Sequence, residues 1–248
     1  MDCRLEICCA DIESVVNARK GGADRIELCM ALELGGLTPS IGLIERAVKV
    51  MGGANVHVLV RPRPGDFIYS GEEALVMEKD ISMAVSAGAA GVVVGALTPD
   101  GRIDVPLSGR LRERFPSVKF TFHRAFDFVS DPYKALESLI GMGYDYLLTS
   151  GLCASALEGA PLIASLAARG GDRIRIMAGA GVSPDNVDEI IRRTGVRDVH
   201  ASAKTRVECI RRNSDVSTGG MVEADDCRYV TSEEVVASLK NRISTYKN

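Results

Sequence analysis

Two thiols are placed where they could share a soft metal ion. Cys8 ends the run Arg4–Cys8, and Cys29 ends the similar run Arg25–Cys29. Neighbouring parallel strands lie about 4.8 Å apart, so the two thiols would end such strands at similar heights. Thiolates favour Cu(I) over hard cations, and the pair therefore predicts a Cu(I) site. The alternative is that both are buried as small apolar groups, which is the usual role of a free cysteine.

A second set of residues could move protons. Glu27, His123 and His200 each lie in or at the end of a short apolar run. A histidine titrates near neutral pH, and a neighbouring carboxylate orients and tunes it. The three residues therefore predict a catalytic acid–base set for isomerase, lyase or hydrolase chemistry. The alternative is a network of internal salt bridges that only fills the fold.

Basic and glycine-rich loops predict that the molecule acted on is a small anion, for example a phosphorylated one. One loop carries two arginines and two prolines, and another is a glycine-rich turn before a helix start. The last loops of a barrel often bind phosphate through backbone N–H groups and a helix N-terminus. The alternatives are a solvated loop and a turn that simply requires glycine. The predicted anion-binding residues are Arg61, Arg63, Gly179, Gly181 and Ser202.

Eight short β-type runs alternate with helical patterns along the whole chain. This alternation predicts a single (β/α)₈ TIM barrel over residues 1–248, although an open doubly wound sheet would give nearly the same pattern. The expected strands are Arg4–Cys8, Arg25–Cys29, Val56–Arg61, Gly91–Gly95, Lys119–His123, Tyr146–Ser150, Arg173–Ala178 and Asp198–Ala201. The expected helices are Ile12–Lys20, Ile41–Met51, Glu72–Ala87, Val105–Phe115, Pro132–Met142, Pro161–Ala168, Asp185–Arg193 and Ser232–Ser244.

The alternation of side chains along each strand predicts which residues face the barrel interior. In Val56–Arg61 the valines would face the helices, while His57, Leu59 and Arg61 would face inward. Branched aliphatic side chains ordinarily fill a barrel, so inward charged groups must pair or bind a ligand. The residues that end their strands are expected to form a site, and the deeper ones are expected to pair internally. The deeper residues are Glu6, Arg25, His57 and Arg175.

Bulk properties limit the partners. The net charge is only −3, and no basic run is interleaved with aromatic residues, so neither nucleic acid nor a membrane is an expected partner. The sequence shows no signal-peptide pattern and no long apolar span. Its seven irregularly spaced cysteines predict reduced thiols and a cytoplasmic location. No organic cofactor is indicated. The polar segment 204–231 predicts a long loop over the catalytic face, or an arm that contacts a partner.

Several long motifs resemble the CutC family between Leu5 and Ala203. The resemblance implies a cytoplasmic TIM barrel with a role in copper homeostasis, and a homo-oligomer such as a dimer or tetramer. It also implies that Cys8 and Cys29 bind Cu(I). The chain departs from the usual pattern in its extra Cys9 and in the turn Ala178–Gly181. The motifs are Leu5–Cys8, Gly21–Cys29, Gly35–Ser40, Arg61–Phe67, Thr121–Asp127, Leu148–Gly151, Ser155–Gly159 and His200–Ala203.

Overall fold

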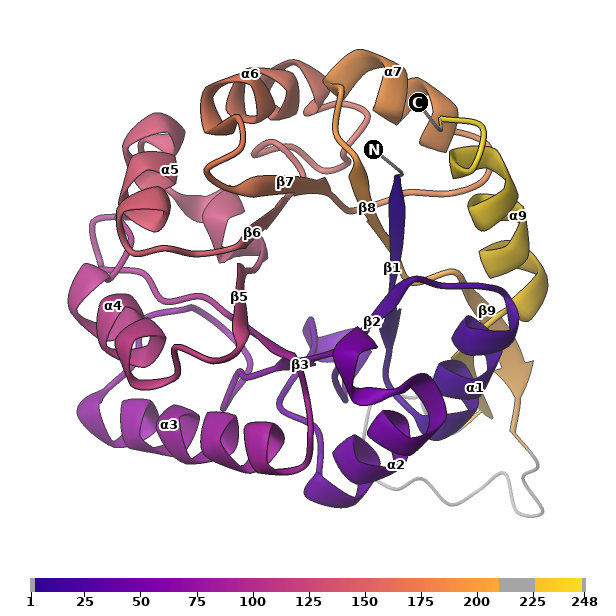
Figure 1. Cartoon of the computed structure of the whole chain (residues 1–248), viewed down its shortest axis with the longest axis horizontal. Coiled ribbons are helices and arrows are strands. Elements are labelled where there is room, and N and C mark those ends of the chain that lie inside the picture. Colours follow the sequence, from indigo (N-terminus) through magenta and orange to yellow (C-terminus); the bar gives the residue numbers. More distant parts are fainter. Residues whose placement is uncertain (1–2, 210–225, 247–248) are drawn as a thin grey trace.

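The protein folds as a closed barrel of eight parallel strands (Figure 1). The computed structural model describes residues 3–209 and 226–246. The strands follow one another around the barrel in chain order, and the last pairs with the first. The predicted TIM barrel is therefore confirmed, and the open sheet is excluded. The barrel strands are β1 (Arg4–Cys9), β2 (Arg25–Leu28), β3 (Val56–Leu59), β4 (Gly91–Val94), β5 (Lys119–Phe122), β6 (Tyr146–Thr149), β7 (Arg175–Ala178) and β8 (Asp198–Ala201).

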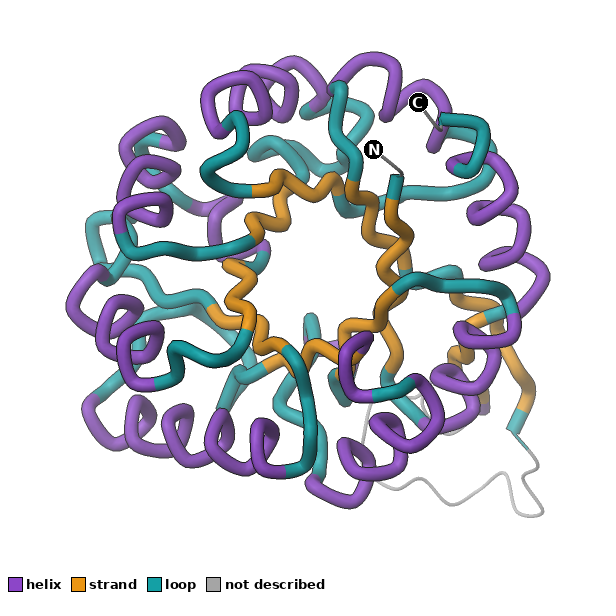
Figure 2. The backbone as a smooth tube through the Cα atoms, viewed as in Figure 1, coloured by secondary structure: helices purple, strands orange, loops and turns teal. Residues whose placement is uncertain are grey.

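Helices of the described residues form a ring outside the strands (Figure 2). Most begin at a side chain that accepts a hydrogen bond from the first helical turn; Asp131, for example, caps α5 at Tyr133 and Lys134. The helices are α1 (Ile12–Lys20), α2 (Ile41–Met51), α3 (Gly71–Ser86), α4 (Val105–Arg114), α5 (Pro132–Gly141), α6 (Ala160–Gly170), α7 (Val187–Thr194) and α9 (Glu233–Ile243).

The seventh helix starts two residues later than the predicted Asp185. Helix α7 begins at Val187, and Asn186 precedes it. The side chain of Asn186 accepts a hydrogen bond from the Ser183 N–H and donates one to the Gly181 carbonyl. These two bonds fold the intervening residues into a turn, so the helix begins only at Val187.

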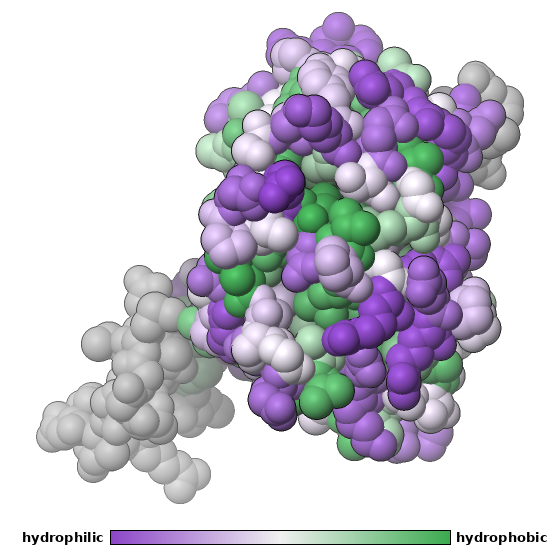
Figure 3. All heavy atoms as spheres, turned by 90° about the vertical axis from the view of Figure 1, so that its left-hand side faces the viewer, coloured by the Kyte–Doolittle hydropathy of each residue, from purple (hydrophilic) through white to green (hydrophobic). Residues whose placement is uncertain are grey.

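The outer surface of the ring is mixed in polarity. Figure 3 shows the side formed by α3, α4 and α5, where hydrophilic side chains surround smaller apolar areas. Within residues 3–209 and 226–246, no helix is long and apolar enough to cross a membrane.

Side chains of the barrel strands divide between two apolar layers. Leu5 and Ile7 belong to the large core between the barrel and the helices. A small separate cluster inside the barrel contains Cys8, Cys29 and Leu59, together with Val93. The predicted inward and outward alternation is therefore confirmed for these strands.

Charged side chains fill the interior toward the N-terminal ends of the strands. Glu6 forms an ion pair with Arg25, and the guanidinium of Arg25 also lies 4.3 Å from the centre of the Tyr146 ring. Arg175 pairs with Asp198 at 2.6 Å. The deeper charges thus compensate one another, as the sequence predicts.

The segment 204–231 is not simply a loop, which corrects the sequence-based expectation. Its two ends form an antiparallel hairpin of β9 (Lys204–Glu208) and β10 (Cys227–Thr231). The hairpin joins α1 through a hydrogen bond from the Thr231 N–H to the Ser14 hydroxyl. Its strands went unrecognised because charged, exposed side chains obscure their alternation. The remainder of the predicted loop, residues 210–225, lies outside the described residues.

Glycines make room for the large polar side chains inside the barrel. A Cβ added at Gly91 would lie 2.5 Å from the His57 ring on the neighbouring strand. Both residues belong to buried strands, so the ring has little freedom to move away.

Gly91→Ala is therefore expected to lower the free energy of unfolding by about 1–3 kcal/mol, because it overpacks the interior. Gly42→Ala is the matched control, since nothing lies within 4 Å of a Cβ at that helical position. The control is expected to keep the stability or raise it by up to about 1 kcal/mol. Chemical denaturation measures both, and equal stabilities for the two variants would contradict the packing argument.

Candidate functional site

A cavity of about 360 Å³ opens at the C-terminal ends of the barrel strands. We call it the mouth cavity. It lies where barrel enzymes place their chemistry, because the βα loops meet there. Strands and loops far apart in the sequence bring most of the predicted site residues to its wall. The predicted residues that line it are Cys8, Glu27, Arg61, His123, Gly181, His200 and Ser202.

Three predicted site residues do not line this cavity. Cys29 lies behind Cys8 and is fully buried. The Arg63 guanidinium is held by Glu73 and Asp66, so the arginine pairs within its own loop and helix. Gly179 provides space, since a Cβ there would lie 2.5 Å from Leu148. Neither Arg63 nor Gly179 is placed to bind an anion in the mouth cavity.

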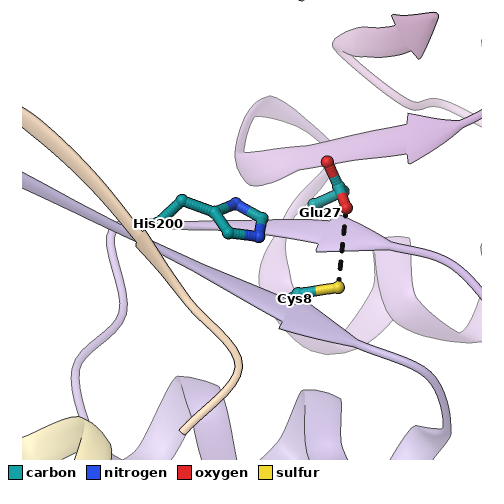
Figure 4. A group of neighbouring side chains, drawn as sticks. All are labelled: Cys8, Glu27 and His200. Atoms are coloured by element: carbon teal, nitrogen blue, oxygen red, sulfur yellow. Dashed lines mark hydrogen bonds between the residues drawn. The ribbon is translucent and has the colours of Figure 1, made fainter. Parts of the chain in front are cut away.

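Cys8, Glu27 and His200 form one cluster at the cavity wall (Figure 4). The residues come from β1, β2 and β8, and their ligating atoms all lie within 4.8 Å of one another. The Cys8 thiol donates to Glu27 Oε1 at 3.5 Å. Burial raises the pKa of Glu27, and the hydrogen bond with Cys29 together with burial raises the pKa of the Cys8 thiol. The Cys8 thiol and the Glu27 carboxyl therefore favour their protonated forms.

Glu6 anchors the cluster from below. Its Oε1 lies 2.8 Å from His200 Nδ1, and its other oxygen binds Arg25. Burial opposes the charge of Glu6, but Arg25 and His200 outweigh it and hold the pKa of the carboxyl well below its usual range. Burial likewise opposes a charged His200, yet the bond to Glu6 and the nearby Glu27 raise the pKa of the imidazole. His200 is thus fixed with Nδ1 facing Glu6 and Nε2 available.

His123 is a neutral group in this cavity. The Ala125 N–H donates to Nδ1 at 3.1 Å, so the ring proton lies on Nε2. Burial and then the positive charge of Arg61 lower the pKa of His123 to about 3. At neutral pH, Nε2–H can donate a hydrogen bond but cannot accept a proton. The geometry therefore favours a donor role over the predicted role in proton transfer.

Arg61 is a fixed positive charge at the cavity wall. Its guanidinium donates to the carbonyls of Leu34, Gly36 and Gly65. The Phe67 ring lies 5.0 Å from the guanidinium carbon. These contacts hold the predicted anion anchor in place, although they occupy much of its hydrogen-bonding capacity.

Buried polar atoms of the lining residues lack partners among the described residues. They are Glu27 Oε2, Arg61 Nε and His123 Nε2. Leaving a buried polar group unbonded costs roughly 1–3 kcal/mol, so such groups are rare away from functional sites. Their association with one cavity indicates that it is built to receive a polar ligand.

Sequence reasoning missed two cations at the rim. Arg124 lines the cavity, and its guanidinium donates to Asp127 and to the Ser150 hydroxyl. Lys204 also lines the cavity, at the start of the hairpin. Arg124 directly follows the inward His123 at a strand end, which is a signal that could have identified it. Lys204 was hidden by the prediction of a loop.

Comparison with known proteins identifies the relatives of this chain. The sequence profile of the CutC family matches residues 3–205. The chain belongs to the CutC family. A CutC family protein of Histophilus somni is 42% identical over 237 residues, covering 95% of this chain and 97% of that protein. The human copper homeostasis protein cutC homolog is 45% identical over 224 residues, covering 90% of this chain and 82% of the human protein.

A solved CutC structure shares the fold. The CutC protein of Streptococcus agalactiae superposes with a TM-score of 0.77 at 32% identity, covering 81% of this chain and 98% of that one. The resemblance seen in the sequence is therefore confirmed, and it groups this chain with proteins named for copper homeostasis.

In this CutC family member, His123 is expected to remain the neutral Nε2–H tautomer at pH 7 and to stay uncharged down to about pH 4. Its pKa of about 3 lies below the ordinary 6.5, so the unfolded chain binds one more proton between those values. The free energy of unfolding should therefore fall as the pH falls from 6.5 toward 3. Nitrogen-15 spectra of the imidazole rings report the tautomer, and denaturation at several pH values reports the slope.

His123→Gln is expected to flatten that slope by the contribution of one histidine. His57 has a similarly lowered pKa of about 3 and remains in the variant, so part of the slope should persist. A His123 signal that titrates near pH 6.5, or an unchanged slope in the variant, would contradict the neutral-donor assignment.

Proposed function

We propose that this CutC family member binds Cu(I) through the thiols of Cys8 and Cys29 at the mouth of the barrel. The observation that best supports this is the 3.5 Å distance between their sulfur atoms. With metal–thiolate bonds of about 2.3 Å, two sulfurs that share an ion lie no more than about 4.6 Å apart. The pair is thus close enough to hold one ion with little rearrangement. The copper-homeostasis name of the human relative agrees with this proposal.

The surroundings of the two thiols favour a soft ion that enters from the cavity. Cys8 lines the mouth cavity, and Cys29 lies behind it beside Leu59 and Val93. The raised pKa of Cys8 means that the ion must displace a thiol proton. Cu(I) affinity should therefore increase with pH.

Replacing either Cys8 or Cys29 by serine is expected to weaken Cu(I) binding by more than about 100-fold, since loss of an outer-shell partner alone costs about 10–100-fold. An anaerobic titration against a competing Cu(I) chelator measures the affinity. Cys153→Ser is the matched control, because that cysteine is exposed and does not line the cavity. Affinities that match the wild type in both the Cys8 and the Cys29 variants would refute the two-thiol site.

A second candidate function is acid–base chemistry on a small anionic molecule, for example a phosphorylated one. The unpartnered His123 Nε2 and the cations Arg61, Arg124 and Lys204 at one cavity favour it. Two sulfurs that bind copper would not require these groups. The loops after β7 and β8 also line the cavity through Gly181 and neighbouring residues, which is where barrels often bind phosphate.

Glu27 and His200 are the groups best placed to exchange protons with such a molecule. Both line the cavity, and both have a raised pKa: burial raises that of Glu27, whereas at His200 burial is outweighed by the hydrogen bond to Glu6 together with the nearby charge of Glu27. An isomerase, lyase or hydrolase reaction would use one of them as the acid and the other as the base after proton release. His123 would donate to the anion.

Inorganic phosphate is expected to raise the melting temperature of the wild type, because a ligand that binds only the folded state stabilises it. The rise should be lost in Arg61→Gln and kept in Arg63→Gln, because Arg61 lines the cavity and Arg63 does not. Comparing each variant with and without phosphate removes the effect of the substitution itself. A rise of the same size in the wild type and in Arg61→Gln would contradict this site.

The expectations of a cytoplasmic location, of a homo-oligomer and of one domain over residues 1–248 stay predictions.

A further inference from the structure

The cluster at the cavity wall offers three different donor atoms to one point. Cys8 supplies sulfur, Glu27 oxygen and His200 nitrogen, and Figure 4 shows the three side chains converging from separate strands. We propose that these three residues form a site for a divalent, borderline-soft cation such as Zn²⁺. This inference goes beyond Cu(I) binding, because it does not use Cys29 as a ligand.

The chemistry of the donors distinguishes this set from the pair of thiols. Zn²⁺ accepts thiolate, imidazole and carboxylate ligands, whereas carboxylate is a poor ligand for Cu(I). Typical zinc bonds of about 2.3 Å to sulfur and 2.1 Å to oxygen place two tetrahedral ligands roughly 3.6 Å apart. Cys8 Sγ and Glu27 Oε1 are 3.5 Å apart. These two ligands are thus already spaced for a tetrahedral cation.

His200 has the partner that a metal-binding histidine needs. A histidine ligand usually donates its other ring N–H to a carboxylate, which fixes the ring and its tautomer. His200 Nδ1 lies 2.8 Å from Glu6 Oε1, and Arg25 fixes the other oxygen of Glu6. Nε2 is left as the metal ligand. Glu6 is therefore a positioning residue for the cation.

Glu27 provides an independent sign of a missing partner. Its side chain is buried, and Oε2 has no hydrogen-bond partner among the described residues. A buried carboxylate needs a compensating charge. A divalent cation held by the Glu27 carboxylate and the Cys8 thiolate would be locally neutral, and both buried negative charges would be compensated.

Three protein ligands leave the fourth tetrahedral position open. That pattern is typical of catalytic rather than structural zinc sites. The open position would face the mouth cavity, whose wall also carries Arg61 and His123. A small anion could then bind the cation and these donors together. When the cation binds, the Cys8 thiol proton, together with the protons of the Glu27 carboxyl and of His200 Nε2 where present, passes to solvent.

Co²⁺ is a suitable probe, because a cobalt–thiolate bond gives a charge-transfer absorption. Metal-free wild type is expected to bind one Co²⁺ per chain with this absorption and to lose it when Zn²⁺ is added. Cys8→Ser should abolish the band. Glu27→Gln and His200→Asn should each weaken binding by more than about 100-fold, and Glu6→Gln by about 10–100-fold. Cys153→Ser is the neutral control, since that cysteine is exposed and outside the cluster.

Two crossed variants separate this proposal from Cu(I) binding. Cys29→Ser should retain Co²⁺ and lose Cu(I), whereas Glu27→Gln should retain Cu(I) and lose Co²⁺. Circular dichroism verifies the fold of each variant, and His200→Gln replaces His200→Asn if that variant unfolds. The three-residue site is overturned if the wild type binds neither Co²⁺ nor Zn²⁺. It is also overturned if folded Glu27→Gln and His200 variants bind Co²⁺ as tightly as the wild type, or if Co²⁺ binding requires Cys29 and not Glu27.

Discussion

The buried carboxylate of Glu6 is the charge on which the interior of this barrel depends. It binds Arg25 from the N-terminal side and His200 from the side of the mouth cavity. An unpaired charge at this depth would cost several kcal/mol, and removing Glu6 would take the counter-charge from both Arg25 and His200. Glu6 also determines the orientation of His200. The ion pair that compensates the buried charges therefore also determines how the cavity wall is arranged.

The space inside the barrel also limits which side chains can point into it. A Cβ at Gly95 would lie 2.4 Å from the His123 ring, just as one at Gly91 would lie 2.5 Å from His57. Glycines at the start of β4 and directly after it therefore admit large polar rings from β3 and from the end of β5, where aliphatic side chains would ordinarily meet. The orientation of His123, with Nδ1 bonded to the Ala125 N–H, follows from this fit. A donor held this rigidly loses little entropy when a ligand binds.

The alternation of strands and helices along the chain predicts the barrel. The alternation of side chains along each strand predicts much of the cavity wall. Alternation along each strand predicts that Cys8, Glu27 and His200 face the interior of the barrel. Because the barrel is closed, these inward side chains lie close together. The side-chain alternation gives no information beyond the end of a strand. It therefore could not predict that the loop residue Arg63 pairs with Glu73. Proton positions depend on single hydrogen bonds that no pattern contains. For the same reason, the sequence could neither assign His123 as a donor nor pair His200 with Glu6.

Cys8 belongs to both proposed metal sites, and this makes them mutually exclusive. Cu(I) held by two thiolates would carry a net negative charge, which would oppose an anion in the same cavity. A divalent cation held by Cys8, Glu27 and His200 would be locally neutral and would keep an open position. The positive groups Arg61 and Arg124 would then favour an anion that completes its coordination. The type of ion bound at Cys8 would therefore decide whether the mouth cavity holds only a metal or also a substrate.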